Sequence, residues 1–352
     1  MRKTFLTFIF ALIMLTITLT SCESVSPSSP TLAPEGALFV ANFSDHAGNL
    51  SMLNTESGEV TVGIAGLGDT PNDILYRNDK LYVINSASNS LDILGFNEDH
   101  NLMPIETVDI GSGPNKSPMF GDFSSDGKLI ISNFNDSTVT ILNPNTPEIQ
   151  EFVKVGLSPS DIKVIDNKAY VCNSGFNLST FGYESGTISV IDIETKTVVD
   201  LIDVGINPQY LDVDSQGRLH VVCTGNYSDV MGEINIIDIN SNSVVESFGI
   251  GGKPVQLAIN HDDVAYLAAF GEWGGEYPGL VFRYNAISGA VLNGPENPIL
   301  VGNGASRVVV DQDGYAYVAC FGGDSIDKIV GDEVVASYLV GDGPTPMMVT
   351  GN

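Results

Sequence analysis

A seven-bladed β-propeller is the architecture that this sequence of 352 residues predicts, because three interleaved series of short segments each occur seven times. Four short strands in each unit of about 40–50 residues are typical of propellers. One blade buries its faces only against its neighbours, so the ring has to close. We therefore expect an all-β fold in which residues 37–352 form the propeller.

The first series is an apolar segment that ends in a small or polar residue, and we expect it to form the second strand, B, of every blade. A run of this length with β-branched and aromatic residues favours a buried strand. The members are LFVAN (38–42), LYVIN (81–85), LIISN (129–133), AYVCN (169–173), LHVVC (219–223), AYLAA (265–269) and AYVAC (316–320).

The second series is a Gly followed three residues later by Pro, expected at the turn from the outer strand D of one blade into the inner strand A of the next. Its members are GDTP (68–71), GSGP (111–114), GLSP (156–159), GINP (205–208), GGKP (251–254), GDGP (341–344) and GNGA (302–305), where Ala305 replaces Pro. The third series is expected to form strand C: NLSMLN (49–54), SLDILGF (90–96), TVTIL (138–142), TISVID (187–192), EINIID (233–238), LVFRY (280–284) and SIDKIV (325–330).

The two ends of the repeat predict how the ring closes. The first blade begins at strand B, with Leu38, and lacks strand A. The chain ends with one spare A strand, PMMVT (346–350). We expect this C-terminal strand to be the innermost strand of the N-terminal blade, beside Leu38–Ala41.

The N-terminal residues have the order of a secretory signal: a basic start, an apolar run too short to span a bilayer, and small residues. Leu19-Thr20-Ser21-Cys22 resembles the lipobox of bacterial lipoproteins. The resemblance implies that residues 1–21 are a signal peptide and that Cys22 carries a lipid. Residues 22–36 then form a Ser/Pro-rich tether. A plain signal peptide and an N-terminal anchor helix are the alternatives.

The net charge of the chain limits the classes of molecule that it can bind. The chain carries 43 acidic and 15 basic residues, a formal charge of −28. Such a surface repels nucleic acid and anionic headgroups, although acidity can also serve solubility alone. Besides Cys22, only Cys172, Cys223 and Cys320 remain, all in apolar strands, and we expect buried free thiols.

The repeat resembles the YVTN-repeat propellers, including YncE-type proteins. The resemblance is carried by LYVIN, AYVCN and the stretch TISVIDIETKTVVDLIDVGINP (187–208), and it covers about residues 38–350. Blades 4 to 6 lengthen their B–C loops, which is similar to surface propeller lipoproteins of Bacteroidetes, some of which capture cobalamin for an outer-membrane transporter. That resemblance implies cobalamin as one ligand and a TonB-dependent transporter as one partner.

The B–C and D–A loops of a propeller emerge on the same face, and aromatic residues concentrate there. Flat rings on Gly-rich loops offer large contact area at low entropy cost, as sugars and planar cofactors require. Anchoring of the loops onto the blade edges is the alternative role. The candidate ligand-binding aromatics are Phe176, Phe181, Tyr183, Tyr227, Phe270, Trp273, Tyr277 and Phe321.

Polar residues just after the Gly-x-x-Pro turns are expected at the mouth of the central channel. Unlike the Gly and Pro beside them, they differ between blades, which indicates an asymmetric polar site; a solvated channel rim is the alternative. The candidates are Gln209, Tyr210, Arg307 and Lys116, and the two cations suggest an anionic group on the ligand. The Asn residues that end four B strands, in contrast, are expected to hydrogen-bond their own turns.

No catalytic motif occurs in the sequence, and no Cys/His cluster has zinc-site spacing. Asp73, Asp161 and Asp212 are candidates to converge on Ca²⁺ in the channel, an arrangement that lactonase-like propellers use. The preferred hypothesis needs no cofactor.

We therefore expect a non-enzymatic, lipid-anchored protein of the cell envelope, either periplasmic or at the outer membrane and cell surface. It would bind a small molecule, cofactor or glycan on the B–C/D–A loop face. A protein–protein scaffold and a metal-assisted hydrolase or lactonase are the alternatives.

Overall fold

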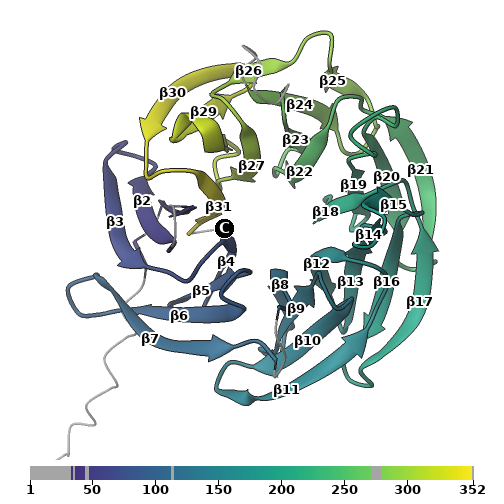
Figure 1. Ribbon diagram of the computed structural model, residues 1–352. Coiled ribbons are helices and arrows are strands. Elements are labelled where there is room, and N and C mark those ends of the chain that lie inside the picture. The colour runs from purple at the N-terminus through teal and green to yellow at the C-terminus, as the bar shows by residue number, and fades with distance from the viewer. Residues whose placement is uncertain (1–32, 35, 44–46, 112–114, 272–278, 351–352) are drawn as a thin grey trace, which may run out of the picture. The chain divides into compact units, whose positions relative to one another are not determined.

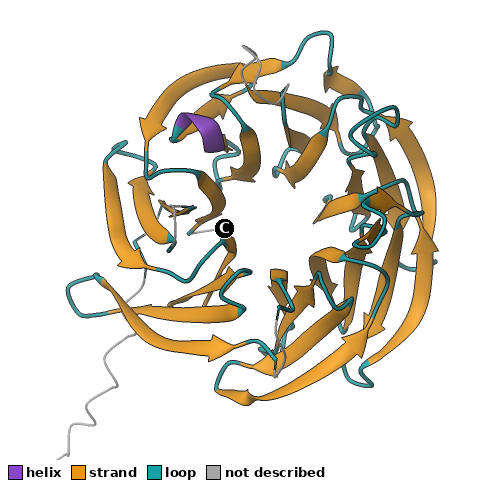
Figure 2. Cartoon of the chain, viewed as in Figure 1, coloured by secondary structure: helices purple, strands orange, loops and turns teal. Residues whose placement is uncertain are grey.

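A computed structural model describes residues 33–34, 36–43, 47–111, 115–271 and 279–350. Seven antiparallel sheets surround a central channel, and each is one blade (Figure 1). Strands account for nearly all regular structure, and one 3₁₀ turn, Phe321–Gly323, is also present (Figure 2). Among the described residues, none belongs to a helix long and apolar enough to cross a membrane.

The inner A strands contact one another in a closed ring around the channel. From blade 1 to blade 7 they are β31 (Pro344–Val349), β4 (Pro71–Arg77), β8 (Pro118–Phe123), β12 (Pro159–Ile165), β18 (Pro208–Val213), β22 (Pro254–Ile259) and β27 (Ala305–Val310). The B strands are β1 (Ala37–Asn42), β5 (Lys80–Asn85), β9 (Leu129–Asn133), β13 (Lys168–Asn173), β19 (Leu219–Cys223), β23 (Val264–Ala269) and β28 (Ala316–Cys320).

The C and D strands complete each blade outward. The C strands are β2 (Asn49–Asn54), β6 (Ser90–Phe96), β10 (Thr138–Asn143), β16 (Thr187–Asp192), β20 (Glu233–Asp238), β24 (Gly279–Asn285) and β29 (Ser325–Val330). The D strands are β3 (Val60–Gly66), β7 (Leu102–Asp109), β11 (Thr146–Lys154), β17 (Thr197–Asp203), β21 (Ser243–Gly249), the pair β25 (Val291–Asn293) and β26 (Ile299–Val301), and β30 (Glu333–Leu339). A short hairpin, β14 (Phe176–Asn177) with β15 (Gly182–Tyr183), lies in the B–C loop of blade 4.

Burial changes from the B and C strands to the outer strands because only the former are covered by neighbouring blades on both sides. The B strand β9 is buried at every position, whereas six of the seven residues of the D strand β17 are exposed. Seven apolar clusters fill the spaces between blades. The continuous apolar runs of the first series are therefore explained by two-sided packing.

The predicted closure is confirmed. Strand β31 pairs with β1 in an antiparallel register that places Leu38 opposite Val349 and Val40 opposite Met347. The main chain adds a hydrogen bond from Thr350 N to Ala37 O at 2.9 Å. Blade 1 therefore consists of three N-terminal strands and one C-terminal strand, and the ring has no open seam.

The repeat also fixes a register between strands A and B. The residue in the Pro position of each A strand lies opposite the last residue of its B strand, as Pro71 lies opposite Asn85 and Ala305 opposite Cys320. In blade 3 this partner is Pro118, opposite Asn133, and not Pro114. The assignment of GSGP (111–114) as the equivalent turn was therefore wrong, because a second Pro four residues later begins the strand.

Gly is required in these turns because the end of strand B lies against it. A Cβ on Gly156 would be 2.6 Å from Asn173 Cγ, and one on Gly341 would be 2.5 Å from Asn42 Cγ. The Asn side chains in turn donate to hydroxyls of strand C, with Asn173 Nδ2 2.9 Å from Ser189 Oγ. Asn173 therefore joins strands within its blade, and the expected hydrogen bond to its own turn was wrong.

Candidate functional site

The B–C and D–A loops lie on one face, because backbone hydrogen bonds join them blade by blade. Phe43 N donates to Gly343 O at 2.9 Å, and Phe321 N donates to Gly304 O at 2.9 Å. In blade 4 the same link runs from Gly175 N to Leu157 O at 3.1 Å. The prediction that these two loop sets share a rim is confirmed, and we call this the loop face.

Five aromatic rings form a row on the loop face, which we call the aromatic ridge: Phe134, Phe176, Phe181, Tyr183 and Tyr227. Phe176 is the centre, with ring centroids 6.1 Å from Phe134, 6.3 Å from Phe181 and 5.2 Å from Tyr183. Tyr183 continues the row to Tyr227 at 6.2 Å. The ridge thus crosses the B–C loops of blades 3, 4 and 5.

Local backbone structure presents the outermost rings to solvent. Phe181 is 78% exposed at the turn of the β14–β15 hairpin and has a φ of 55°. Tyr227 is 41% exposed and has a φ of 60°. The left-handed region is unusual for bulky residues and is found where a loop orients a side chain. Phe181 is therefore too exposed to anchor this loop on the blade edge.

The other predicted aromatics do not join the ridge. Phe321 pairs with Phe43 across blades 7 and 1, with ring centroids 6.0 Å apart. Phe270 is half-buried just after β23. Trp273 and Tyr277 lie outside the described residues.

Inside the channel, the second residue after each Pro position points inward, and we call this ring of side chains the upper level. It consists of Asp73, Phe120, Asp161, Tyr210, Gln256, Arg307 and Pro346. Arg307 of blade 7 lies over the ring of Phe120 in blade 3, 5.1 Å from its centroid, and Phe120 meets Tyr210 edge-on at 5.8 Å. These three side chains span the channel, so the predicted residues Tyr210 and Arg307 are indeed brought together.

Gln209 and Lys116 lie elsewhere. The Gln209 side chain donates a hydrogen bond to Asn207, and the backbone carbonyl of Gln209 accepts one from Ser160 Oγ at 2.7 Å. Lys116 forms an ion pair with Asp136 and lies 4.5 Å from the ring centroid of Phe152 on the outer strand β11. The shifted start of strand A in blade 3 explains this, because Phe120 occupies the channel position that Lys116 was expected to approach.

The fourth residue after each Pro position forms a lower level, nearer the A–B turns: Leu75, Asp122, Lys163, Asp212, Ala258, Val309 and Met348. Lys163 Nζ lies 3.2 Å from Asp212 Oδ1. A cavity of about 300 Å³ extends from Asp73, Asp161 and Tyr210 of the upper level through this lower level to Val310 and Val349. Arg307 and Phe120 are not part of its lining.

Carboxylates of the two levels also join neighbouring blades. Asp73 accepts from Gly121 N at 3.0 Å and Asp161 from Leu211 N at 2.8 Å on the upper level. Asp122 accepts from Val164 N at 2.7 Å and Asp212 from Ile259 N at 2.8 Å on the lower level. The acceptor thus alternates between levels from blade 2 to blade 5, so the channel lining is part of the scaffold.

Burial controls the protonation of these groups. It raises the pKa of Asp73 to about 7, although hydrogen bonds and the charge of Arg307 oppose the change. Burial likewise raises the pKa of Asp161 well above its usual range and that of Asp122. Asp212 raises the pKa of Lys163, whose ammonium therefore stays charged. Near neutral pH the channel contains fixed cations and carboxylates that readily hold protons.

Other ionisable groups are structural or unsuited to catalysis. His220 is fully buried and hydrogen-bonds Tyr284 Oη at 2.8 Å and Asp214 Oδ2 at 3.1 Å. Cys172, Cys223 and Cys320 are buried free thiols, as expected. Across the described part of the chain, no three His, Cys, Asp or Glu side chains are grouped closely enough to hold a metal ion.

Sequence comparisons give this chain no family. No family model matches it, and no curated protein matches it.

Solved structures share the fold at low identity. A putative 6-phosphogluconolactonase from Bacteroides fragilis is 12% identical with a TM-score of 0.64, over 91% of this chain and 99% of that one. Apo AztD from Citrobacter koseri is 14% identical with a TM-score of 0.53, over 88% and 96%. Virginiamycin B lyase from Staphylococcus aureus is 13% identical with a TM-score of 0.55, over 86% and 91%. At these identities the likeness shows the propeller fold alone.

Proposed function

We propose that this chain is a non-enzymatic binding protein of the YVTN-repeat type, anchored in the cell envelope by a lipid on Cys22. Its loop face takes up a small molecule, cofactor or glycan and passes it to an outer-membrane transporter of the TonB-dependent class. The likeness to solved propellers supports the scaffold only, so the proposal depends on the loop face.

The aromatic ridge is the observation that supports this proposal most directly. Its rings come from three different blades, and two of them, Phe181 and Tyr227, remain exposed. Exposed rings on loops fixed to rigid strands lose little conformational freedom when a ligand stacks on them. A flat ligand, such as a sugar ring or a planar macrocycle, makes the best use of such a row.

A protein partner is the second candidate, and one observation favours it. Three aliphatic side chains on loops of blades 4 and 5 are exposed beside the aromatic loops: Leu157 at 40%, Leu178 at 45% and Met231 at 52%. Exposed apolar side chains that gather on one face are typical of interaction surfaces.

Mass spectrometry of molecules that co-purify from native envelopes, followed by calorimetry with cyanocobalamin and maltoheptaose, tests the proposal. We expect one of the probes to bind, and the double variant Phe181→Ala/Tyr227→Ala to lower its affinity at least tenfold, about 1.4 kcal/mol. Leu339→Ala, at a position that is 75% exposed on the outer strand β30, is the matched control. An unchanged affinity in the double variant excludes the ridge, and a co-purified protein in place of a small molecule supports the second candidate.

Lipid attachment is tested separately, by metabolic labelling with an alkyne fatty acid. The intact chain is expected to incorporate the label and to sediment with membranes. The Cys22→Ala variant should lose the label and leave the membrane fraction, because a lipid is the proposed anchor. Membrane association of an unlabelled Cys22→Ala chain would instead favour an N-terminal anchor helix.

A further inference from the structure

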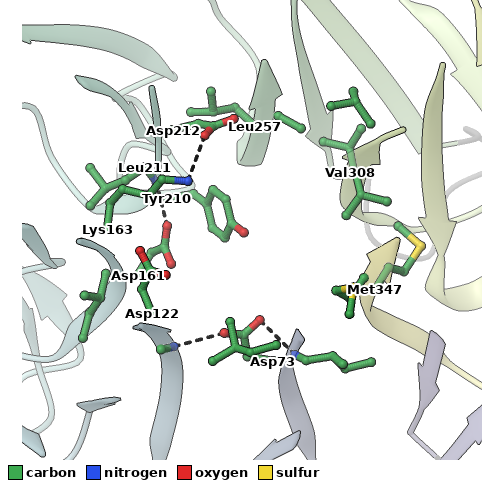
Figure 3. A pocket seen from close by; sticks show the side chains of 18 of the residues that line it. Asp73, Asp122, Asp161, Lys163, Tyr210, Leu211, Asp212, Leu257, Val308 and Met347 are labelled. Atoms are coloured by element: carbon green, nitrogen blue, oxygen red, sulfur yellow. Dashed lines mark hydrogen bonds and ion pairs between the residues drawn. The ribbon is translucent and has the colours of Figure 1, made fainter. Parts of the chain in front are cut away.

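The channel cavity has two chemically different walls. Blades 2 to 5 supply Asp73, Asp122, Asp161, Lys163 and Asp212. Blades 6, 7 and 1 supply only apolar or small residues, namely Leu257, Ala258, Val308, Val309, Val310, Met347, Met348 and Val349. Figure 3 shows the separation, with Asp161 and Lys163 on one side and Val308 and Met347 on the other.

The wall formed by blades 2 to 5, which we call the ionisable wall, carries more carboxyl groups than cations. Four carboxylates line the cavity, and its single lysine is already paired with Asp212. Asp161 is only 5% exposed, and no cation of the described residues lies within ion-pair distance of it. A buried carboxylate without a counter-ion is costly. Burial therefore raises the pKa of Asp161, so the carboxyl holds a proton unless a cation takes the proton's place.

The channel cavity is large enough for a small organic molecule, and its upper end is bounded by an aromatic ring. Water occupies about 30 Å³ per molecule in the liquid, so 300 Å³ is room for about ten waters or a small organic molecule. At one end the ring of Tyr210 is part of the lining, and an aromatic face attracts organic cations. Arg307 and Phe120 span the channel beyond Tyr210 and lie outside the lining. The cavity therefore extends away from the aromatic ridge, toward the A–B turns.

We propose that this cavity binds a small organic cation, an alkylammonium or quaternary ammonium with an apolar body. The ammonium lies among Asp73, Asp122 and Asp161, and the apolar body lies against Val308, Val309 and Met347. The cation takes the place of the protons that these buried carboxyls otherwise hold, and its charge adds to those of Lys163 and of Arg307 on the upper level. This site is separate from the proposed function of the loop face and does not depend on it.

Three ligands of one shape test the charge requirement: cyclohexylmethylammonium, the neutral cyclohexylmethanol and the anionic cyclohexanecarboxylate. They are titrated calorimetrically into the full chain in nonionic detergent, with detergent-only titrations subtracted. We expect the ammonium to bind at one site and at least tenfold more tightly than the alcohol, and the carboxylate not to bind. No binding of the ammonium, or tighter binding of the carboxylate, would overturn the proposal.

Two variants locate the binding. Val309→Phe fills the cavity from its apolar wall and is expected to abolish ammonium binding with the unfolding midpoint preserved. Asp122→Asn keeps a side-chain acceptor for Val164 N but removes one charge, and it should weaken the ammonium at least tenfold and leave the alcohol unchanged. Val334→Phe on the exposed face of β30 is the control. Full ammonium affinity in a folded Val309→Phe chain would place the ligand elsewhere.

Discussion

The aromatic ridge and the channel lining are built from different parts of the same blades. The ridge lies on loops, and its outermost ring, Phe181, is mostly exposed. The channel side chains lie on the A strands, and their carboxylates also hold the blades together, as Asp161 does with Leu211. The difference teaches that the loop face can change its specificity at little cost in stability, whereas any change in the channel alters both stability and chemistry.

The largest expected effect concerns the pH dependence of stability in the channel. The pKa of Asp73 is about 7 in the folded chain, near Arg307 and Asp122, and 3.8 as its ordinary value. Between pH 3.8 and pH 7 the Asp73 carboxyl is protonated in the folded chain and ionised in the unfolded chain. The proton therefore stabilises the folded chain at low pH, and this stabilisation is lost as the pH rises through 7. Between pH 5 and pH 8 the wild-type chain should lose about 2–3 kcal/mol more unfolding free energy than Asp73→Asn.

Urea unfolding at four pH values measures this slope. Asp203→Asn, at an exposed position on β17, is the control and should keep the wild-type slope. Parallel slopes for the wild type and Asp73→Asn would mean that the Asp73 carboxylate is solvated.

A smaller effect is expected at the boundary between the two regions, where loops enter the A strands. Gly156→Ala places a methyl group 2.6 Å from Asn173 Cγ and should lower the unfolding free energy by about 1–3 kcal/mol. Gly66→Ala on β3 is the matched control, because a Cβ there meets nothing within 4 Å. Equal urea midpoints for both variants would show that the turn relaxes freely.

The smallest effect is expected on the loop face. Phe181→Ala should change the unfolding free energy by less than about 0.5 kcal/mol, because so exposed a ring contributes little to the core. The urea midpoint measures it. A loss above about 1 kcal/mol would mean that the ridge is part of the scaffold, and the contrast between the two regions would fail.

The sequence predicted the architecture well because its repeat records backbone constraints. In five of the turns a Cβ on the Gly would meet the last residue of strand B, and the Pro position is set by the register of strand A. The seven blades and the closing strand were therefore all predictable. Blade 3 was the exception, since GSGPNKSP contains two prolines and only the sheet register selects Pro118. Because of that error, Phe120 was not predicted to lie in the channel. Its position two residues after Pro118, equivalent to that of Tyr210 and Arg307 in their blades, would have indicated it.

The candidate site could be predicted only where its residues lie close together in the sequence. Phe176, Phe181 and Tyr183 lie on one loop, so their proximity follows from the sequence. The channel cavity is lined by all seven blades, and its two walls depend on which side chains of each A strand face inward. Tyr210 and Arg307, which were expected at the channel mouth, lie inside the channel, and Tyr210 also lines the cavity. They lie there because every second side chain of a strand points to the same side.

Closure by β31 has a mechanical consequence. Strand β1 is held on both sides, by β2 and by β31, and its first residues are tied to Thr350. Tension applied to the chain before Ala37 would run along the strand and strain two rows of hydrogen bonds in shear, instead of opening one row at a time. The blade that receives any pull from the N-terminal segment is thus the one fastened by both ends of the chain.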